Sequence, residues 1–419
     1  MHALLLSHYF EPEHGAPQRR WRALIEQLTA MGCAVDVIAP VPHHPSGRAK
    51  DGRYRAGTTE LGAHGASVHR VSYLPHDGSL MRRTIDHVWV AMCSARRGSA
   101  LIKRGSIGRP DVVVATAPAL PTLAAGWWLA KRHAIPFVVE MRDAWPDLVS
   151  HTPGLHGSRS LKHELKQLVH RAVTAVQRSA DAVVTTTEAF ADVLRARGIQ
   201  HVEVIRNGTD PAAYEAVAPP EDLHRALRVL YMGTIGRSQG LDTVVRAVAR
   251  LREAGVRLDA RIVGAGADHA QLRDLNRRLG SPVDVREAVL PEEVLAHYRW
   301  ADTCVVSLRD WEPFRWTVPS KLYELMATGK HLTAILAGEG AAIVQKTDCG
   351  VVIAPGDVDG LVEAWALLER ERDALLVSDA GQRWVREHVT YPRLADEYLR
   401  LFSAVVSRGR TSAPPARSA

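Results

Sequence analysis

The feature of this sequence that most limits its fold is a regular alternation of short apolar runs with helical patterns. The runs in the first half of the chain are residues 3–6, 34–39, 67–71, 112–115, 137–140, 182–185 and 202–205. Those in the second half are residues 229–232, 261–263, 283–285, 303–307, 332–335 and 350–353. Strands that alternate with helices predict the α/β class, with doubly wound, mainly parallel sheets. Because ligands bind at the carboxyl ends of such strands, we expect the chemistry in the loops that follow them.

The length of 419 residues indicates two large domains rather than a single core. We predict an N-terminal domain over residues 1–206 and a C-terminal domain over residues 227–389. The proline-rich stretch 207–226 reads as the connection between them. A final helix over about residues 390–406 is expected to pack back on the first domain, and residues 407–419, rich in Ser, Arg and Pro, read as a disordered tail.

The composition is that of a globular protein, with 46% apolar and 24% charged residues. The four cysteines have no metal-binding or redox spacing, which fits isolated thiols in a reducing compartment. The first residues lack the charged region and the long apolar run of a signal peptide. Residues 112–130 are uncharged, but Pro118 and Pro121 divide them into a strand, a loop and a helix, so we expect no transmembrane segment.

The formal charge of +7 indicates attraction to polyanions or to anionic membrane surfaces. Two segments concentrate this charge: Arg82, Arg83, Arg96, Arg97, Lys103, Arg104 and Arg109 in the first, and Arg159, Lys162, Lys166, His170 and Arg171 in the second. Both segments suit contact with a bilayer, and both also suit the solvated faces of surface helices. No motif indicates binding to nucleic acid.

The stretch from Pro319 to Gly329 combines helix-start chemistry with ionisable residues. Pro319 suits the start of a helix, and Gly329 suits its end. Ser320 and Lys321 fall in the first turn, where free N–H groups and a cation attract phosphate. Glu324 lies one turn later on the same face as Ser320, within reach of sugar hydroxyls. The stretch suggests a nucleotide site, and the alternative is an ordinary capped helix with a solvated glutamate.

Two glycine-containing loops, at Gly15 and at residues 233–240, follow the first strand of each domain and precede a helix. Such loops can bind anions, although small turns use glycine as well. Gly264-Ala265-Gly266 begins like a dinucleotide fingerprint, but His269 stands where the third glycine belongs. We therefore do not expect a nicotinamide or flavin enzyme.

Taken together, these residues resemble the retaining glycosyltransferases of family 4, which have the GT-B fold, and especially the bacterial surface-polysaccharide branch. The matching segments are residues 8–15 with Arg20, 142–146, 207–210, 233–236, 319–324, 338–341 and 355–357, in the expected order. The resemblance implies two Rossmann-like domains that face each other across a cleft, with the acceptor mostly on the first and a nucleotide sugar mostly on the second. It also implies transfer with retention, of a hexosyl or N-acetylhexosaminyl group, and no cofactor or metal.

The resemblance also assigns roles to residues on the donor side. Glu324 matches the second glutamate of the family's E-x7-E motif and would hold the donor ribose. Gly15, Ser320, Lys321 and the Gly236-Arg237 loop would bind the diphosphate. The first glutamate of the motif falls on Trp316, so Glu312 or Asp310 would contact the donor sugar, unless these are solvated loop acids. The family's basic pair falls near Thr234 and Gln239, so Arg237 and Lys321 would replace it.

On the acceptor side Asp143 is the best candidate for a catalytic residue. It follows a strand and has Trp145 and Pro146 beside it, so an acceptor hydroxyl could donate to its carboxylate. The alternative is a helix N-cap. His8, His14 and Arg20 are further candidates for contact with the acceptor or the sugar, and a bystander role is the alternative for the two histidines.

These observations predict a glycosyltransferase in the cytoplasm, or attached to the inner face of the plasma membrane, that serves cell-surface polysaccharide or glycolipid assembly. Its expected partners are a nucleotide sugar donor, a glycan or lipid-linked acceptor and an anionic membrane surface. Two alternatives stay open: a nucleotide-sugar 2-epimerase with the same fold, and a non-catalytic protein that binds nucleotide sugars or membranes.

Overall fold

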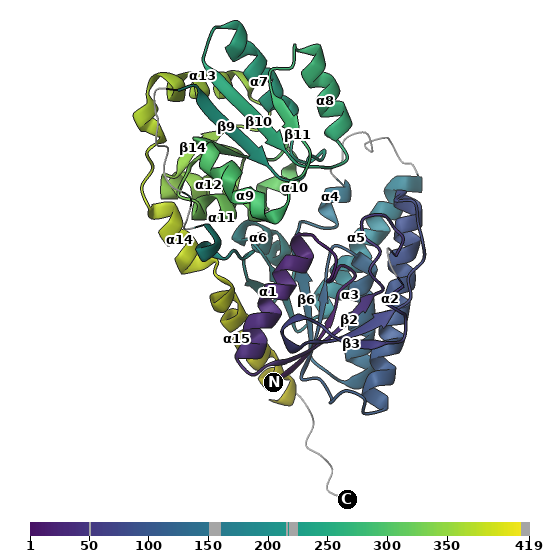
Figure 1. Cartoon of the computed structure of the whole chain (residues 1–419). Coiled ribbons are helices and arrows are strands. Elements are labelled where there is room, and N and C mark those ends of the chain that lie inside the picture. Colours follow the sequence, from purple (N-terminus) through teal and green to yellow (C-terminus); the bar gives the residue numbers. More distant parts are fainter. Residues whose placement is uncertain (50–51, 151–160, 215–216, 218–224, 412–419) are drawn as a thin grey trace, which may run out of the picture. The chain divides into compact units, whose positions relative to one another are not determined.

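The computed structural model describes residues 1–49, 52–150, 161–214, 217 and 225–411. The chain divides into two compact units (Figure 1). The first unit contains residues 1–207 and the helix that begins at Tyr391, and the second contains residues 208–390. The chain therefore leaves the first unit once and returns to it at its end.

The first unit is built on a sheet with the strand order β3-β4-β2-β1-β5-β6-β7-β8. The strands are β1 (His2–Leu6), β2 (Ala34–Pro40), β3 (Thr59–Leu61), β4 (Ser67–Val71), β5 (Val112–Thr116), β6 (Phe137–Met141), β7 (Ala182–Thr185) and β8 (Val202–Val204). Every pair is parallel except β3 with β4. The strand order reverses between β1 and β5, so a ligand site is expected outside their carboxyl ends.

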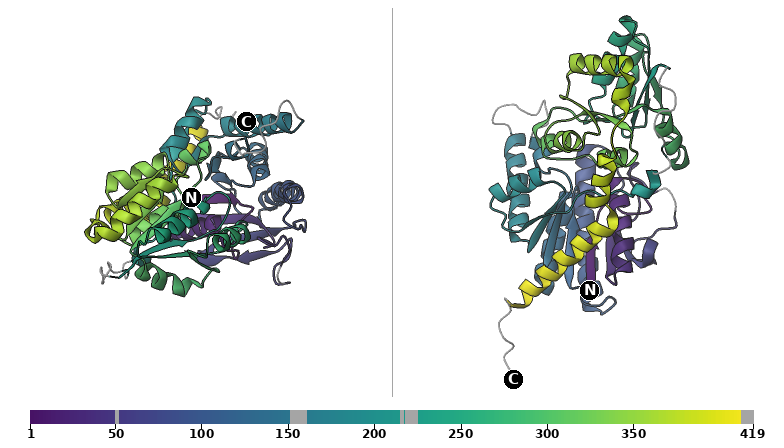
Figure 2. Two further views of the ribbon diagram at one scale, coloured as in Figure 1. Left: turned by 90° about the horizontal axis from the view of Figure 1, so that it is seen from above. Right: turned by 90° about the vertical axis from the view of Figure 1, so that its left-hand side faces the viewer.

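The helices of the first unit are α1 (Ala16–Ala30), α2 (Leu80–Lys103), α3 (Leu120–His133), α4 (Asp147–Ser150), α5 (Leu161–Ser179), α6 (Glu188–Ala196) and α15 (Tyr391–Thr411). A short 3-10 helix, η1 (Ala63–Gly65), precedes β4. Helix α3 packs against α2 and α5, and α1 packs against α15. Leu394, Tyr398 and Phe402 of α15 are fully buried in the core that α1 forms with the sheet, and α15 lies along this unit in Figure 2.

Two boundaries differ from those expected from the sequence. Residues 407–411, expected in a disordered tail, continue helix α15 to Thr411, and residues 412–419 lie outside the described residues. Of the expected connection 207–226, residues 208–214 belong to the second unit. They include the 3-10 helix η2 (Pro211–Tyr214) and a bridge between Thr209 and Thr390. Residues 215–216 and 218–224 lie outside the described part of the chain.

The second unit has an entirely parallel sheet with the order β11-β10-β9-β12-β13-β14. Its strands are β9 (Leu227–Met232), β10 (Leu258–Val263), β11 (Asp284–Arg286), β12 (Thr303–Ser307), β13 (His331–Ile335) and β14 (Gly350–Ile353). Alternate residues of β9 enter two different cores, Leu230 the one that contains Tyr323 and Val229 the one that contains Trp365. Both faces of this sheet are therefore covered.

The helices of the second unit are α7 (Asp242–Glu253), α8 (His269–Arg278), α9 (Val294–Trp300), α10 (Glu312–Arg315), α11 (Ser320–Ala327), α12 (Glu339–Thr347), α13 (Val358–Arg370) and α14 (Ala380–His388). Two 3-10 helices, η3 (Pro291–Glu293) and η4 (Arg372–Leu375), complete the unit. Among the described helices of the chain, none is both long enough and apolar enough to cross a bilayer.

Candidate active site

The second unit has its topological switch point between β9 and β12, where the strand order reverses. The loop after β9 and the loop after its neighbour β10 run close together at this edge of the sheet. The amide of Ile235 donates to the carbonyl of Ala265 at 2.9 Å, and the amide of Asp268 donates to the carbonyl of Ile235 at 3.0 Å. A Cβ on Gly264 would lie 1.8 Å from the carbonyl oxygen of Gly233, so a side chain there would force the loops apart.

Helix α11 begins at Ser320, so Pro319 is its N-cap rather than a residue of its first turn. Gly329 beyond the end of the helix is left-handed, as the sequence predicted. Leu322, Leu325 and Met326 are buried and anchor the helix in the core. The side chains of Lys321 and Glu324 are partly exposed. The Nζ atom of Lys321 donates to Glu324 Oε2 at 2.6 Å and to the Tyr298 hydroxyl at 3.2 Å.

The side chain of Lys321 also reaches the loop after β9. Its Cε atom would be 3.9 Å from a Cβ placed on Gly233. The structure thus brings together the first turn of α11 and the loop that the sequence singled out as anion-binding. A cation, a carboxylate and free helix N–H groups at one place can hold a phosphate together with a sugar hydroxyl.

Arg237 projects from the same loop, and its side chain is 76% exposed. The amide of Gly236 donates to Gln239 Oε1 at 3.1 Å, so this amide is already satisfied inside the loop. Arg309, two residues after β12, holds the loop in place. Its backbone N–H donates to the carbonyl of Ser238 and its Nε–H to the carbonyl of Arg237.

Arg309 and Tyr298 were not among the residues predicted from the sequence. Arg309 could have been found, because it lies two residues after the end of β12, where loops of α/β sheets commonly carry ligand-binding residues. Tyr298 gives no such signal, since it lies in α9, 23 residues before the lysine that it contacts.

Glu312, the proposed substitute for the missing first glutamate, is exposed at the start of α10, and Trp316 follows the end of that helix. The loop after β13 comes very close to α10, because a Cβ on Gly338 would lie 2.0 Å from the carbonyl oxygen of Arg315. A hollow of about 330 Å³ lies nearby, lined in part by Arg309, Asp310 and Trp311. Lys321 and Glu324 do not line this hollow.

In the first unit Gly15 is the N-cap of α1, and no side chain caps this helix. His14 beside it is exposed. Asp143 follows β6 and is exposed as well. Helix α4 begins at Asp147, four residues later, so Asp143 does not occupy the N-cap position that was the alternative explanation for it.

Arg20 has a different position from the one that a ligand contact requires. Its guanidinium is buried and donates to Glu140 Oε1 at 3.0 Å, to the carbonyl of Ile205 at 3.0 Å and to the Tyr398 hydroxyl at 3.2 Å. Trp21 Nε1 and the Tyr398 hydroxyl also donate to Glu140. Arg20 therefore joins α1, β6 and α15, and we do not include it in the proposed site.

Burial opposes ionisation of Glu140, but the Arg20 guanidinium and the hydrogen bonds around it keep the pKa of this carboxyl below its usual value. Burial strongly raises the pKa of Tyr398, so its hydroxyl stays a donor. The network is closed, with a charged donor and a charged acceptor matched inside the core.

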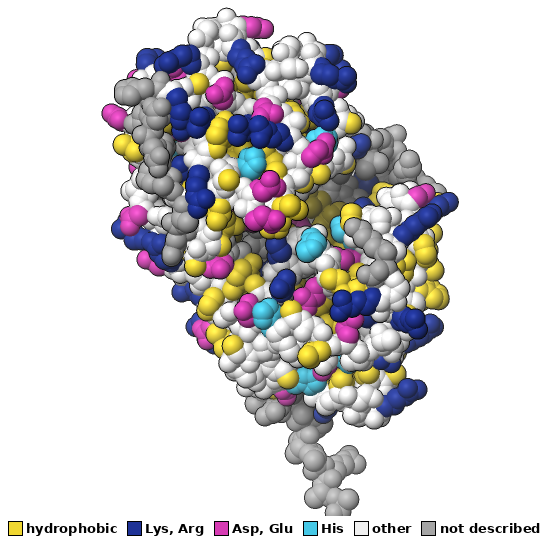
Figure 3. Space-filling view, viewed as in Figure 1, with side chains coloured by type: hydrophobic (Ala, Val, Ile, Leu, Met, Phe, Trp, Pro, Cys, Tyr) yellow, Lys and Arg dark blue, Asp and Glu magenta, His cyan; other side chains and the backbone are white. Residues whose placement is uncertain are grey.

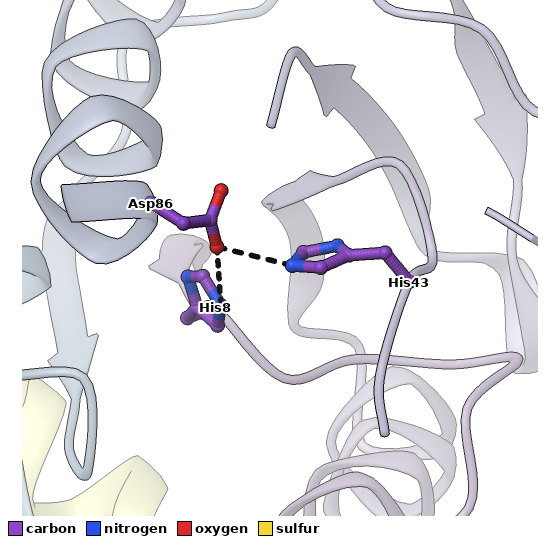
Figure 4. Close-up of side chains that lie close together, drawn as sticks. All are labelled: His8, His43 and Asp86. Carbon is purple, nitrogen blue, oxygen red and sulfur yellow. Dashed lines mark hydrogen bonds and ion pairs between the residues drawn. The ribbon is translucent and has the colours of Figure 1, made fainter. Parts of the chain in front are cut away.

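His8 is also buried, in a cluster with His43 and Asp86 (Figure 4). His43 Nε2 lies 3.1 Å from Asp86 Oδ2, and His8 Nε2 lies 3.5 Å from the same oxygen. Burial lowers the pKa of His8 well below its ordinary value, and neighbouring histidines add to this. His43 keeps a raised pKa despite its burial, because it hydrogen-bonds to Asp86. Among the described residues, this group has the composition of a metal site.

Two family models match the sequence, a "Glycosyl transferase 4-like domain" over residues 15–208 and "Glycosyl transferases group 1" over residues 226–370. Each model thus falls largely on one of the two units. A search of curated protein sequences found no significant match.

Solved structures with a similar fold span nearly the whole chain. HepE of Anabaena, in complex with UDP and glucose, has 16% identity and a TM-score of 0.65 over 96% of this chain and 99% of its own. A glycosyltransferase of Rickettsia africae has 13% identity and a TM-score of 0.66 over 97% and 98%. WaaG, a glycosyltransferase involved in lipopolysaccharide biosynthesis, has 14% identity and a TM-score of 0.64 over 96% and 99%. With both of its α/β units matched, this chain belongs to the family 4 retaining glycosyltransferases and has the GT-B fold.

Proposed function

We propose that this enzyme transfers a sugar from a nucleotide-diphosphate sugar to a glycan or lipid-linked acceptor, in cell-surface polysaccharide or glycolipid assembly. The observation that supports binding of the donor is the Lys321–Glu324 pair at the start of α11, beside the glycine loop after β9. This pair is partly exposed, and Arg237 in the same unit is largely exposed.

The chemistry of sugar transfer suits these groups. A departing diphosphate gains negative charge, which helix N–H groups, Lys321 and Arg237 stabilise without proton transfer. Glu324 accepts from the ribose hydroxyls, and its ion pair with Lys321 keeps both side chains in position before the donor arrives. Ser320 belongs to the same diphosphate site through the first turn of α11, whereas the Gly236 amide donates to Gln239 and contributes only to the shape of the loop. Gly15, the N-cap of α1, stays a separate candidate for anion binding within the first unit.

The acceptor half rests on the first unit. We assign Asp143 to the acceptor hydroxyl, because its carboxylate is exposed at the carboxyl end of β6. His14 is exposed before α1 and suits contact with the acceptor or the sugar, whereas Glu312 of α10 suits the donor sugar. His8 is buried, so it reaches a substrate only through its neighbours.

The base of the donor nucleotide can be identified by testing a set of nucleoside diphosphates for binding. Structures of HepE hold UDP and UDP-glucose, and a starch synthase of the same fold holds ADP, so uracil is the first candidate and adenine the second. We propose to measure thermal unfolding with UDP, ADP, GDP and dTDP, with and without chelator. A ligand at a hundred times its dissociation constant adds about 2.7 kcal/mol of stability.

The matched pair of variants for this panel is Glu324→Ala and Glu363→Ala. Glu363 is exposed on α13 of the same unit and has no part in the site. One diphosphate should stabilise the wild type and Glu363→Ala but not Glu324→Ala. If Glu324→Ala responds like the wild type, the donor site is wrong.

The two alternative functions are separated by product analysis. A 2-epimerase changes a nucleotide sugar without any acceptor, whereas a transferase releases nucleoside diphosphate in proportion to the acceptor that it glycosylates. Binding of a nucleotide sugar without either product, over a broad acceptor panel, would favour the binding protein.

We further propose that the enzyme works at the cytoplasmic face of an anionic membrane, with α2 as the contact. Five apolar side chains of α2 are exposed: Leu80, Met81, Ile85, Val88 and Met92. Arg82, Arg83 and Arg96 lie on the same helix, and hydrophobic and basic side chains alternate along the α2 edge of the molecule (Figure 3). A membrane contact accounts for both kinds of side chain, because the apolar ones can insert into the bilayer and the arginines can bind anionic headgroups. Of the second basic segment, Arg159 and the side chain of Lys162 lie outside the described residues.

Sedimentation with lipid vesicles tests this contact. We expect binding to vesicles that contain phosphatidylglycerol and loss of binding to neutral ones. Met81→Glu should weaken it strongly, and Leu290→Glu, at an exposed apolar side chain of the second unit, should not. Equal binding of both variants would reject α2 as the contact.

A further inference from the structure

The cluster of His8, His43 and Asp86 comes from three separate segments of the first unit. His8 follows β1, His43 follows β2 and Asp86 lies in the second turn of α2. One ligand atom from each residue can be chosen so that all three lie within 4.8 Å of one another. Figure 4 shows both imidazole rings turned toward the Asp86 carboxylate.

The distances suit a tetrahedral ion. Ligand atoms at about 2.0 to 2.1 Å from a tetrahedral Zn²⁺ are separated from one another by roughly 3.3 Å. The separations from Asp86 Oδ2 are 3.1 Å to His43 Nε2 and 3.5 Å to His8 Nε2. The separation of 3.5 Å is too long for a good hydrogen bond. Both separations are close to the ligand–ligand distance expected around a tetrahedral Zn²⁺ ion.

The groups behind the cluster orient it as the second shell of a metal site does. The Nδ1 atom of His43 lies 2.8 Å from the carbonyl oxygen of Val41, to which it can donate, which leaves Nε2 for the cluster. Asp86 Oδ1 accepts from the amide of Leu74 at 2.7 Å, which leaves Oδ2 for the cluster. The side chains of His8, His43 and Asp86 are 2%, 2% and 0% exposed.

His8 lacks a comparable anchor. Its Nδ1 atom is buried and has no hydrogen-bond partner among the described residues. Its Nε2 atom has the long contact to Asp86 described above. Ligation of an ion by one ring nitrogen would hold this imidazole in place, which its hydrogen bonds do not.

We propose that His8, His43 and Asp86 bind one Zn²⁺ ion, with a water molecule as the fourth ligand. The ion joins the loop after β1, the loop after β2 and helix α2, and so fixes the carboxyl edge of the sheet in the first unit. It is separate from the diphosphate chemistry assigned to the second unit and does not depend on the proposed function. The competing explanation is a proton on His43 that pairs with Asp86 and needs no ion.

The test uses the full chain, purified without a polyhistidine tag and dialysed against chelator. Co²⁺ is added first, because a four-coordinate Co²⁺ site absorbs visible light far more strongly than hexa-aqua Co²⁺. Zn²⁺ is then titrated in, and unfolding temperature is followed in parallel. We expect one equivalent of Co²⁺ to give the intense spectrum, and one equivalent of Zn²⁺ to displace it and raise the unfolding temperature.

Two variants make the assignment specific. His8→Ala removes one ligand and leaves both partners of the His43–Asp86 pair in place, so we expect the fold to be preserved. Its Zn²⁺ affinity should fall by more than the roughly 10- to 100-fold that follows loss of a second-shell partner. His44→Ala is the matched control, because His44 is adjacent to His43 but exposed, and it should bind like the wild type.

The outcomes are distinct. A weak six-coordinate Co²⁺ spectrum in the wild type, or none, would overturn the proposal and favour the shared proton. Equal binding by His8→Ala and the wild type would overturn it as well. Circular dichroism tests whether His8→Ala is folded. If this variant is unfolded, the Co²⁺ spectrum of the wild type alone decides.

Discussion

Two cation–glutamate pairs, one in each unit, have the same kinds of charged group and differ in burial and in their other hydrogen-bond partners. In the first unit Arg20 and Glu140 are 2% and 0% exposed, and Trp21 and Tyr398 add hydrogen bonds to the same carboxylate. In the second unit Lys321 and Glu324 are 25% and 14% exposed, with Tyr298 as a further partner of the lysine. The first pair is enclosed by protein on all sides, whereas the second is partly open to solvent.

The difference separates structural from functional charge. A buried carboxylate whose partners are all protein groups can stabilise the fold but cannot exchange those partners for a substrate. A partly exposed pair contributes little to stability, and its groups can turn to a ligand. Burial and partners, rather than residue type, therefore decide which pair belongs to the proposed donor site.

The largest expected effect is on stability and follows from Glu140→Ala. The change leaves the Arg20 charge buried without its carboxylate and removes the acceptor of Trp21 and Tyr398. We expect a loss of about 3 to 5 kcal/mol in the free energy of unfolding. Urea unfolding, followed by the fluorescence of the tryptophans, measures it. A loss below about 1 kcal/mol would mean that the pair is not the anchor described here.

The next effect is on activity and follows from Glu324→Ala. Loss of a group that contacts the donor should lower kcat/KM by about 10²- to 10³-fold, as for other preorganised polar contacts. Because the pair is partly exposed, the free energy of unfolding should change by about 1 kcal/mol or less. Steady-state kinetics, with the sugar conjugate of the nucleotide that stabilises the enzyme as donor, gives kcat/KM. Urea unfolding gives the free energy of unfolding. If Glu324→Ala lost much stability and kept normal activity, the Lys321–Glu324 pair would be structural rather than functional.

A third test uses pH. The pKa of Glu140 in the folded protein is below its usual value of 4.5. Its contribution to stability is therefore complete above about pH 4.5 and is lost as the pH falls from there through the folded pKa. The urea midpoint of the wild type should drop in that range, and Glu140→Gln should flatten the drop. Identical slopes for the two proteins would show that another group controls the acid sensitivity.

The smallest expected effect is on stability and serves as a control. It uses helix α15, which has an exposed ion pair and a buried hydrogen bond. Arg393 and Glu397 form an i,i+4 pair at 3.0 Å, with the arginine side chain 52% exposed. Arg393→Ala should change stability by only about 0.3 to 0.5 kcal/mol. Tyr398→Phe, one residue beyond Glu397, removes a hydrogen bond to the buried Glu140 and should cost more. Equal effects on the urea midpoint would mean that burial does not distinguish them.

Much of the fold could be predicted from the sequence, because buried parallel strands are near-continuous apolar runs. The alternation of these runs with helices predicted the α/β class and the two similar sheets, and the family models and similar structures confirm it. Strand β3 was missed, since it has three residues and an exposed Thr59 and Leu61. The end of α15 was missed as well, because serine and arginine in its last turns resemble a solvated tail.

The site was predictable only where its parts are close in sequence. Ser320, Lys321 and Glu324 share one helix, so spacing alone placed them together. The buried network of Arg20 could not be predicted, because its carboxylate partner is 120 residues away and its tyrosine partner is 378 residues away. The partners of His8 are likewise distant, and no local pattern in the sequence joins His8, His43 and Asp86.

The position of α15 in the first unit has a consequence for synthesis on the ribosome. Leu394, Tyr398, Phe402 and their buried neighbours in α15 complete a core whose remaining side chains come from the first 205 residues. At the usual rate of translation, roughly 10 to 40 seconds pass between synthesis of the end of β8 and synthesis of α15. During that interval the side chains of α1 that pack on α15 have no cover from their own chain. The nascent protein should therefore be a client of ribosome-associated chaperones until its last residues emerge.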